Sequence, residues 1–316
     1  MQFDILMPSI LFFVTLAAMF LGRKAEPKLK STVEEREFRT RDVVLLVAIL
    51  AFAISIIVFI PGLALVALFL FSYSSLLFTV SYAFSGFKTY RMELFCVGFI
   101  VAGILAGVAG VTGVMPMELK IYGVSAFTIF AVLSFCALLY AHGKPEAKLK
   151  WYLAALPPIL FVLLYIFFGT TFLWLPYLLD AYGITFAMLI VIYLGSLFNW
   201  KTVFVFAGLI TALDIVLVWG PSQVMITTAQ TVASYGLPVL VTFPTIPLAY
   251  ATAQGVTYIQ FLSLGLGDFF FAGVLSTQTM KQFGKKTAII SLFTICISFA
   301  LFELLLLNPN LAAILP

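Results

Sequence analysis

Long apolar stretches, separated by short polar loops, run through the whole sequence. A membrane-spanning helix needs about 20 mostly apolar residues, and this length divides the chain into about ten predicted spans. The stretches are continuously apolar and lack the period-two alternation of barrel strands, so they predict α-helices. The predicted spans are Phe3–Leu21, Val43–Ile60, Leu63–Phe84, Leu94–Val114, Tyr122–Ala141, Trp151–Phe172, Ile184–Leu197, Thr202–Trp219, Tyr250–Met280 and Thr287–Leu307.

The composition agrees with this pattern. Hydrophobic residues make up 63% of the chain and charged residues 9%, whereas soluble domains carry roughly 25% charged residues. The predicted fold class is all-α, a polytopic transmembrane helix bundle. We predict two regions: residues 1–201 form an N-terminal bundle of about seven spans with a cytoplasmic loop at residues 23–42, and residues 202–316 form a region that carries two intramembrane aspartates.

Basic residues gather in loops that this span count places on one side of the membrane. They lie in residues 23–41, 88–91, 144–150 and 281–286 and at Lys201, whereas Lys120 falls on the other side. The positive-inside rule places these loops in the cytoplasm and the N-terminus outside. We therefore predict a multi-pass integral membrane protein of the cell membrane. The net charge of +4 is a topology signal, and no nucleic-acid-binding surface is evident.

Two aspartates lie inside predicted spans, where a charged carboxylate is costly and usually carries a function. Asp214 follows Lys201 by 13 residues, and Asp268 precedes Lys281 by 13 residues. At ~1.5 Å per residue, each aspartate lies about 20 Å from the cytoplasmic end of its span. Antiparallel neighbouring helices would bring the two carboxylates face to face.

Two neighbouring carboxylates favour a state in which one is protonated and the other is charged. The charged member can activate a water molecule, and the protonated member can polarise a peptide carbonyl and later protonate the leaving amine. Gly265 and Gly267 remove side chains just before Asp268, so that an extended backbone can approach. The same Gly-x-Gly spacing also occurs at ordinary helix contacts in membranes.

The run Gly265-Leu266-Gly267-Asp268 resembles the Gly-x-Gly-Asp signature of the presenilin and signal peptide peptidase family. The segment Leu213-Asp214-Ile215-Val216 resembles the surroundings of the first catalytic aspartate of that family, where a tyrosine usually stands in place of Leu213. The resemblance covers roughly residues 202–316 and suggests a prokaryotic-type homologue.

This resemblance implies an intramembrane aspartyl protease, which hydrolyses peptide bonds within transmembrane segments by means of an Asp214/Asp268 dyad and a water molecule. Gly265, Leu266, Gly267 and Leu213 would bind the substrate or support the site. The implied partners are transmembrane protein substrates and the lipid bilayer; no cofactor or metal and no particular oligomeric state are predicted.

The sequence departs from the family in two respects. The Pro-Ala-Leu motif that begins one more helix in the family does not occur here, and residues 314–316 stand about where it is expected. We expect either that the polypeptide continues beyond this point or that it works without that helix. The predicted spans before Asp214 also outnumber those of the family, which implies additional N-terminal helices or a misplaced division between spans.

Other functions compete with the protease. A proton- or cation-coupled secondary transporter would also need intramembrane carboxylates, but no repeat between the halves of the chain supports it. A noncatalytic presenilin-like protein fits the missing motif. A prepilin-type peptidase shares the Gly-x-Gly-Asp pattern, but its usual basic residue after the aspartate is replaced here by Phe269-Phe270-Phe271.

Several further residues have simpler interpretations. Cys96, Cys136 and Cys296 fall inside spans far apart, which supports neither a disulfide framework nor a zinc site. Asp180 is interpreted as the start of a helix. Glu303 is interpreted as a residue at the level of the lipid headgroups or in a contact between helices. The segment at residues 221–255 is interpreted as a connector, or alternatively as an extended segment that pairs with a substrate strand.

Overall fold

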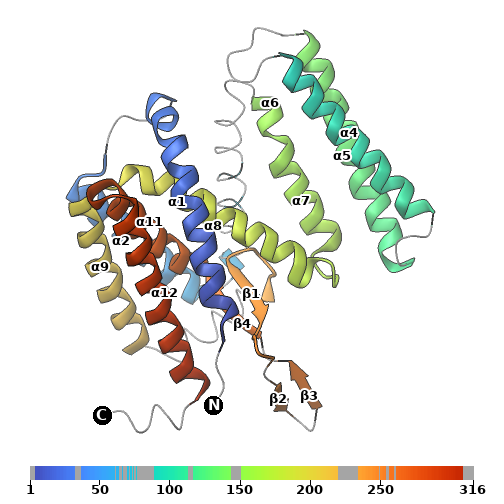
Figure 1. Ribbon diagram of the computed structural model, residues 1–316. Helices are drawn as coiled ribbons and strands as arrows, with labels where there is room; N and C mark the ends of the chain where they lie inside the picture. The colour runs from blue at the N-terminus through green and yellow to red at the C-terminus, as the bar shows by residue number, and fades with distance from the viewer. Residues whose placement is uncertain are drawn as a thin grey trace. The chain divides into compact units, whose positions relative to one another are not determined.

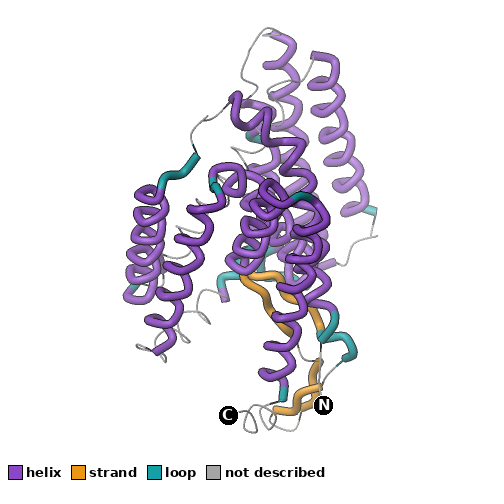
Figure 2. The backbone as a smooth tube through the Cα atoms, turned by 60° about the vertical axis from the view of Figure 1, so that its left-hand side comes forward, coloured by secondary structure: helices purple, strands orange, loops and turns teal. Residues whose placement is uncertain are grey.

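The computed structural model describes most of the chain and divides it into two units. Unit 1 comprises Met1–Leu68 and Leu179–Pro316, and unit 2 comprises Phe69–Leu178. The described residues are 4–32, 37–60, 62–63, 66, 70, 72, 74, 76, 89–112, 117–143, 151–219, 234–248, 250–253, 256–259 and 261–308. They are mostly helical, as Figures 1 and 2 show.

Unit 1 is built from long helices and short strands. Its helices are α1 (Leu6–Thr32), α2 (Thr40–Phe59), α8 (Leu179–Leu197), α9 (Trp200–Trp219), α11 (Leu266–Phe283) and α12 (Lys285–Leu307). Helix α1 packs against α8, α11 and α12, and α11 also contacts α9. The main apolar core joins α1, α8, α11 and α12 through side chains that include Met7, Leu11, Ala187, Phe269 and Leu292. Helix α11 therefore lies at the centre of the unit.

Helices α8 and α11 approach closely because one of them lacks a side chain at the contact. A Cβ atom at Gly273 of α11 would overlap the side chain of Val191 in α8. Gln278 of α11 also stabilises the contact with α8. Its Nε2 donates hydrogen bonds to the backbone oxygens of Gly195 at 2.9 Å and Phe198 at 2.6 Å. Backbone carbonyls at the end of a helix need such partners when they are buried.

The strands of unit 1 form two small antiparallel sheets among the described residues. Strand β1 (Leu240–Pro244) pairs with β4 (Phe261–Gly265), and β2 (Tyr250–Ala253) pairs with β3 (Val256–Ile259). Figures 1 and 2 show the strands gathered near the end of unit 1 at which α1 begins. Strand β4 runs directly into α11, so the sheet determines where that helix starts.

The start of α1 is tied to the segment after β1 by Asp4. Its carboxylate accepts hydrogen bonds from the backbone nitrogens of Leu6 and Met7, at 3.2 and 2.8 Å. It also accepts one from the backbone nitrogen of Ile246 at 2.8 Å. An aspartate before a helix satisfies the unpaired N–H groups of the first turn, and here the same side chain holds a distant segment as well.

Unit 2 is helical. It contains α4 (Thr89–Val111), α5 (Met117–Gly143), α6 (Trp151–Ala154), α7 (Leu156–Phe168) and a π-helical turn, η1 (Trp174–Leu178). Helices α4 and α5 lie close together at Gly103, where a Cβ atom would come within 2.9 Å of the Ala131 Cβ. Small residues at such contacts are typical of helices that pack in membranes.

Five helical segments of the described residues are long and apolar enough to cross a membrane. They are Leu6–Arg23, Tyr90–Ala109, Lys120–Gly143, Leu179–Leu197 and Lys285–Leu305. Shorter apolar helices occupy Tyr152–Phe168 and Trp200–Leu213. The structure is thus that of a helical, membrane-embedded protein. Most of the predicted span Leu63–Phe84 lies outside the described residues.

Two predicted spans differ from the structure. The stretch Trp151–Phe172 is divided into α6 and α7, because Pro157 and Pro158 cannot continue a preceding helix without losing backbone hydrogen bonds. The stretch Tyr250–Met280 was predicted as one helix, and this is wrong: Tyr250–Gly265 contains strands, and α11 begins at Leu266. Threonine and other β-branched residues with nearby glycines favour strands there.

Candidate active site

Helices α9 and α11, which carry the two predicted aspartates, are antiparallel neighbours. At one end, the rings of Trp200 and Phe283 lie 5.0 Å apart between centroids. Further along, the rings of Phe206 and Phe270 lie 5.4 Å apart. The beginning of α9 therefore meets the end of α11, as the sequence predicted for the spans that carry the aspartates.

The contact between Trp200 and Phe283 allows the heights of the two aspartates to be compared. Asp214 follows Trp200 by 14 residues, and Asp268 precedes Phe283 by 15 residues. At ~1.5 Å per residue, both backbone positions lie about 21 to 23 Å from the same end of the helix pair. The side chain of Asp214 lies outside the described part of the structure.

Leu213 of α9 packs against the same apolar cluster as the beginning of α11. Leu213 is partly buried in an apolar cluster that also contains Phe270 and Phe271. These phenylalanines follow Asp268 by two and three residues. Leu213 and the two phenylalanines therefore pack against the same apolar core.

Asp268 lies in the first turn of α11 and is exposed. One carboxylate oxygen accepts a hydrogen bond of 3.2 Å from the backbone nitrogen of Gly265, the residue that caps the helix. A carboxylate in this position also benefits from the positive end of the helix dipole. The local fold therefore holds Asp268 at the junction of β4 and α11, on the surface of the unit.

The two glycines of the Gly-x-Gly-Asp run have different surroundings. A Cβ atom at Gly265 would lie 3.4 Å from a carboxylate oxygen of Asp268. A Cβ atom at Gly267 would meet nothing within 4 Å. Between them, Leu266 donates its backbone N–H to the oxygen of Val239 at 3.0 Å and so continues the β1–β4 pairing into α11. The space around Gly267, the residue directly before Asp268, is therefore open.

Strand β1 uses its outer edge to bind Asp180. The backbone nitrogen of Thr242 donates to the Asp180 carboxylate at 2.7 Å. Asp180 is buried in the first turn of α8, which agrees with its predicted place at the start of a helix. Its further role, holding β1 against α8, was not predicted, because the two residues are 62 positions apart.

Strand β4 presents its other edge on the side of Asp268. Thr242 is paired with Ser263, and their hydroxyl oxygens lie 2.8 Å apart. Because the Thr242 N–H points away from the pair, the Ser263 backbone points away from β1 too. Gly265, two residues further on, directs its N–H to Asp268. The outer edge of β4 thus leads to the Asp268 carboxylate.

Other candidate groups are placed as follows. Glu303 is buried in α12, and its Oε2 has no hydrogen-bond partner in the described structure; burial favours the helix-packing interpretation over a headgroup-level one. Cys96, Cys136 and Cys296 are free. Among the described residues, no three His, Cys, Asp or Glu side chains come together as a metal site.

Comparisons with protein-family models, with curated proteins and with solved structures find no match.

Proposed function

We propose that this protein is an intramembrane aspartyl protease, with Asp214 and Asp268 as its catalytic pair. The observation that carries the proposal is the antiparallel contact of α9 and α11, which places both aspartates at nearly the same height above the Trp200–Phe283 contact. Two aspartates whose backbone positions lie at one height on adjacent apolar helices suit shared-proton chemistry better than separate structural roles.

The proposed reaction is hydrolysis of a peptide bond. The charged carboxylate takes a proton from water while the water oxygen attacks the carbonyl carbon, and the protonated carboxyl donates a hydrogen bond to the carbonyl oxygen. The amide nitrogen then receives a proton as its bond to carbon breaks. The products are a new carboxyl end and a new amine end, and the pair returns to its singly protonated state.

The substrate in this proposal is a transmembrane segment that unwinds locally and pairs with the outer edge of β4. Addition of a strand to an open sheet edge satisfies the backbone groups of an unwound segment, which would otherwise be costly in a membrane. Ser263 and Gly265 lie on the edge that leads to Asp268. The open space at Gly267 leaves room for the substrate backbone next to the carboxylate.

The proposed topology has about ten spans, with the N-terminus outside and the basic loops in the cytoplasm. The arrangement of unit 1 supports it: α1 and α12 contact each other, and Figure 1 draws the beginning of α1 and the end of α12 at one end of the unit. Arg23, Lys281 and Lys285 line one pocket near the other end. We propose the cell membrane as the location.

The test is cleavage of a labelled transmembrane peptide by the full chain in liposomes. Asp214→Asn and Asp268→Asn should each reduce cleavage to background. Asp42→Asn is a matched control, because Asp42 also lies in the first turn of its helix and accepts the backbone N–H of its capping residue, Arg39, at 2.8 Å.

The control separates chemistry from helix capping. If Asp42→Asn retains wild-type cleavage and the two site variants lose it, the loss belongs to the carboxylates and not to the cap. Cleavage at the wild-type rate by Asp268→Asn would refute the dyad. Absence of cleavage by the wild type, together with proton uptake that depends on Asp268, would favour the transporter instead.

A further inference from the structure

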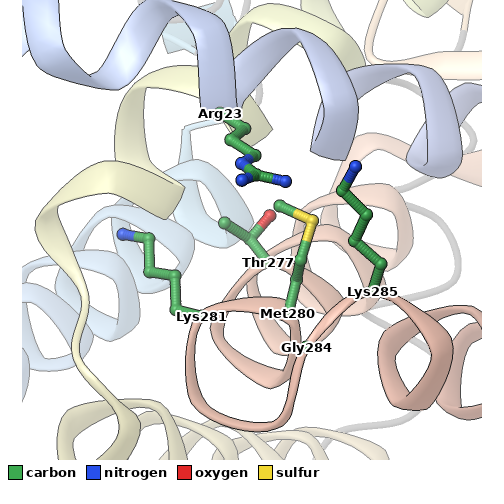
Figure 3. Close-up of a pocket in the computed structure, with 6 residues that line it drawn as sticks. All are labelled: Arg23, Thr277, Met280, Lys281, Gly284 and Lys285. Atoms are coloured by element: carbon green, nitrogen blue, oxygen red, sulfur yellow. The ribbon is translucent and has the colours of Figure 1, made fainter.

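A pocket of about 480 Å³ opens between α1, α11 and the start of α12, away from the proposed catalytic pair. Figure 3 shows the residues that line it: Arg23, Thr277, Met280, Lys281, Gly284 and Lys285. The volume is within the usual range for small-molecule sites, roughly 300 to 1,000 Å³. The pocket lies where α11 turns into α12, at the end of these helices that carries basic residues.

The charge of the pocket is positive. In Figure 3, Arg23 lies above Thr277 and Met280, Lys285 lies to the right of Met280, and Lys281 lies to the left of Thr277. Helix α12 begins at Lys285, and its capping residue, Gly284, provides no side-chain hydrogen bond to the first turn. The unpaired N–H groups and the dipole of a helix start favour an anion.

Thr277 supplies an independent indication of a polar ligand. It is only 6% exposed, and its hydroxyl oxygen has no hydrogen-bond partner in the described structure. Figure 3 shows this hydroxyl directed to the Arg23 side of the pocket. A buried hydroxyl without a partner is costly, so a ligand oxygen that accepts its hydrogen bond would remove a penalty present in the empty protein.

We propose that this pocket binds a phosphate group. Guanidinium, ammonium and hydroxyl donors with a helix start form the donor set that phosphate oxygens prefer. Met280 adds an apolar wall on which a glycerol or acyl carbon would pack. The phosphate can belong to the headgroup of an anionic lipid or to a soluble phosphate compound, and binding does not depend on the proposed protease activity.

The experiment measures binding of phosphatidylglycerol, phosphatidylcholine and inorganic phosphate to the purified full chain in detergent, by native mass spectrometry and thermal unfolding. One cation near an anionic lipid headgroup contributes about 1 kcal/mol, which is about fivefold in affinity. We therefore expect Arg23→Gln and Lys285→Gln each to weaken phosphatidylglycerol binding by this factor. Lys286→Gln is the matched control, because Lys286 is the adjacent exposed lysine and does not line the pocket.

Thr277→Val gives a second test that a purely structural role cannot imitate. Valine has the shape of threonine without the hydroxyl, so the empty protein should unfold at the same temperature or higher. Its affinity for phosphatidylglycerol should nevertheless fall, whereas Thr277→Ser should keep it. Loss of affinity in a protein of undiminished stability assigns the hydroxyl to the ligand.

The comparison of phosphatidylglycerol with inorganic phosphate distinguishes the two sources of the phosphate group. Tight binding of phosphatidylglycerol that inorganic phosphate displaces only weakly assigns the pocket to a lipid headgroup. Inorganic phosphate that binds as tightly assigns it to a soluble phosphate compound. Equal weakening by Lys285→Gln and Lys286→Gln would show diffuse surface attraction, and equal binding of phosphatidylcholine would show no recognition of charge; either result overturns the proposal.

Discussion

Replacing Gly267 by alanine should abolish cleavage while leaving the fold intact. Apart from its chain neighbours and its own helix backbone, the added methyl group meets no atom within 4 Å, and the φ angle of Gly267 is not in the left-handed region. An alanine in a helix is more stable than a glycine by about 0.5 to 1 kcal/mol, which corresponds to a rise in Tm of up to about 1.5 °C for a chain of this size.

Activity should respond in the opposite direction, because the methyl group occupies the open space at Gly267, through which the proposed substrate backbone reaches Asp268. A substrate backbone displaced by about 1 Å can lose about 100-fold in rate, since the attacked carbonyl leaves its productive position. The assay compares the rate of peptide cleavage in liposomes with the thermal unfolding of the same preparation. Wild-type cleavage by the Gly267→Ala variant would refute close approach of the substrate there. A fall in Tm of several degrees would show that the glycine serves packing.

Three further predictions follow from the contacts of α11. Gly273→Ala should lower the free energy of unfolding by about 1 to 3 kcal/mol, because the methyl group would overlap the side chain of Val191. Unfolding of the variant and the wild type in the same detergent measures this difference. Gln278→Leu should cost about 1 to 3 kcal/mol, because it leaves the backbone oxygens of Gly195 and Phe198 unpaired; a stability equal to wild type would contradict this role. Cleavage should follow a bell-shaped pH profile, lost in acid when both carboxylates are protonated and in alkali when both are charged; a flat alkaline limb would contradict the shared proton.

The helices of this protein were predictable where apolar length alone decides the structure. The predicted spans Val43–Ile60, Thr202–Trp219 and Thr287–Leu307 correspond closely to α2, α9 and α12. Burial of an apolar run of about 20 residues in lipid leaves the backbone no alternative to a helix. The antiparallel contact of α9 and α11 also followed, because alternating topology makes consecutive spans antiparallel.

The strands within the predicted span Tyr250–Met280 were not predicted, because hydropathy alone does not distinguish a helix from a strand that pairs with protein. Tyr250–Gly265 carries no charged residue, as in a span, but its backbone groups find partners in β1 and within the β2–β3 hairpin. The roles of Asp4 and Asp180 depend on partners 242 and 62 residues away. Such pairings arise only from the assembled fold, although an aspartate just before an apolar run does indicate a helix start.

The position of α1 has a consequence for the biosynthesis of the protein. Helix α1 enters the membrane first, yet its packing partners α8, α11 and α12 all follow Leu178 in the chain. Ribosomes add about 5 to 20 residues per second, so the 242 residues between Asp4 and Ile246 separate them by roughly 12 to 50 seconds. During that interval Asp4 can bind only the nearby N–H groups of Leu6 and Met7. The core of unit 1 is therefore completed late in synthesis, and the proposed catalytic pair on α9 and α11 is completed only after most of the helices have been made.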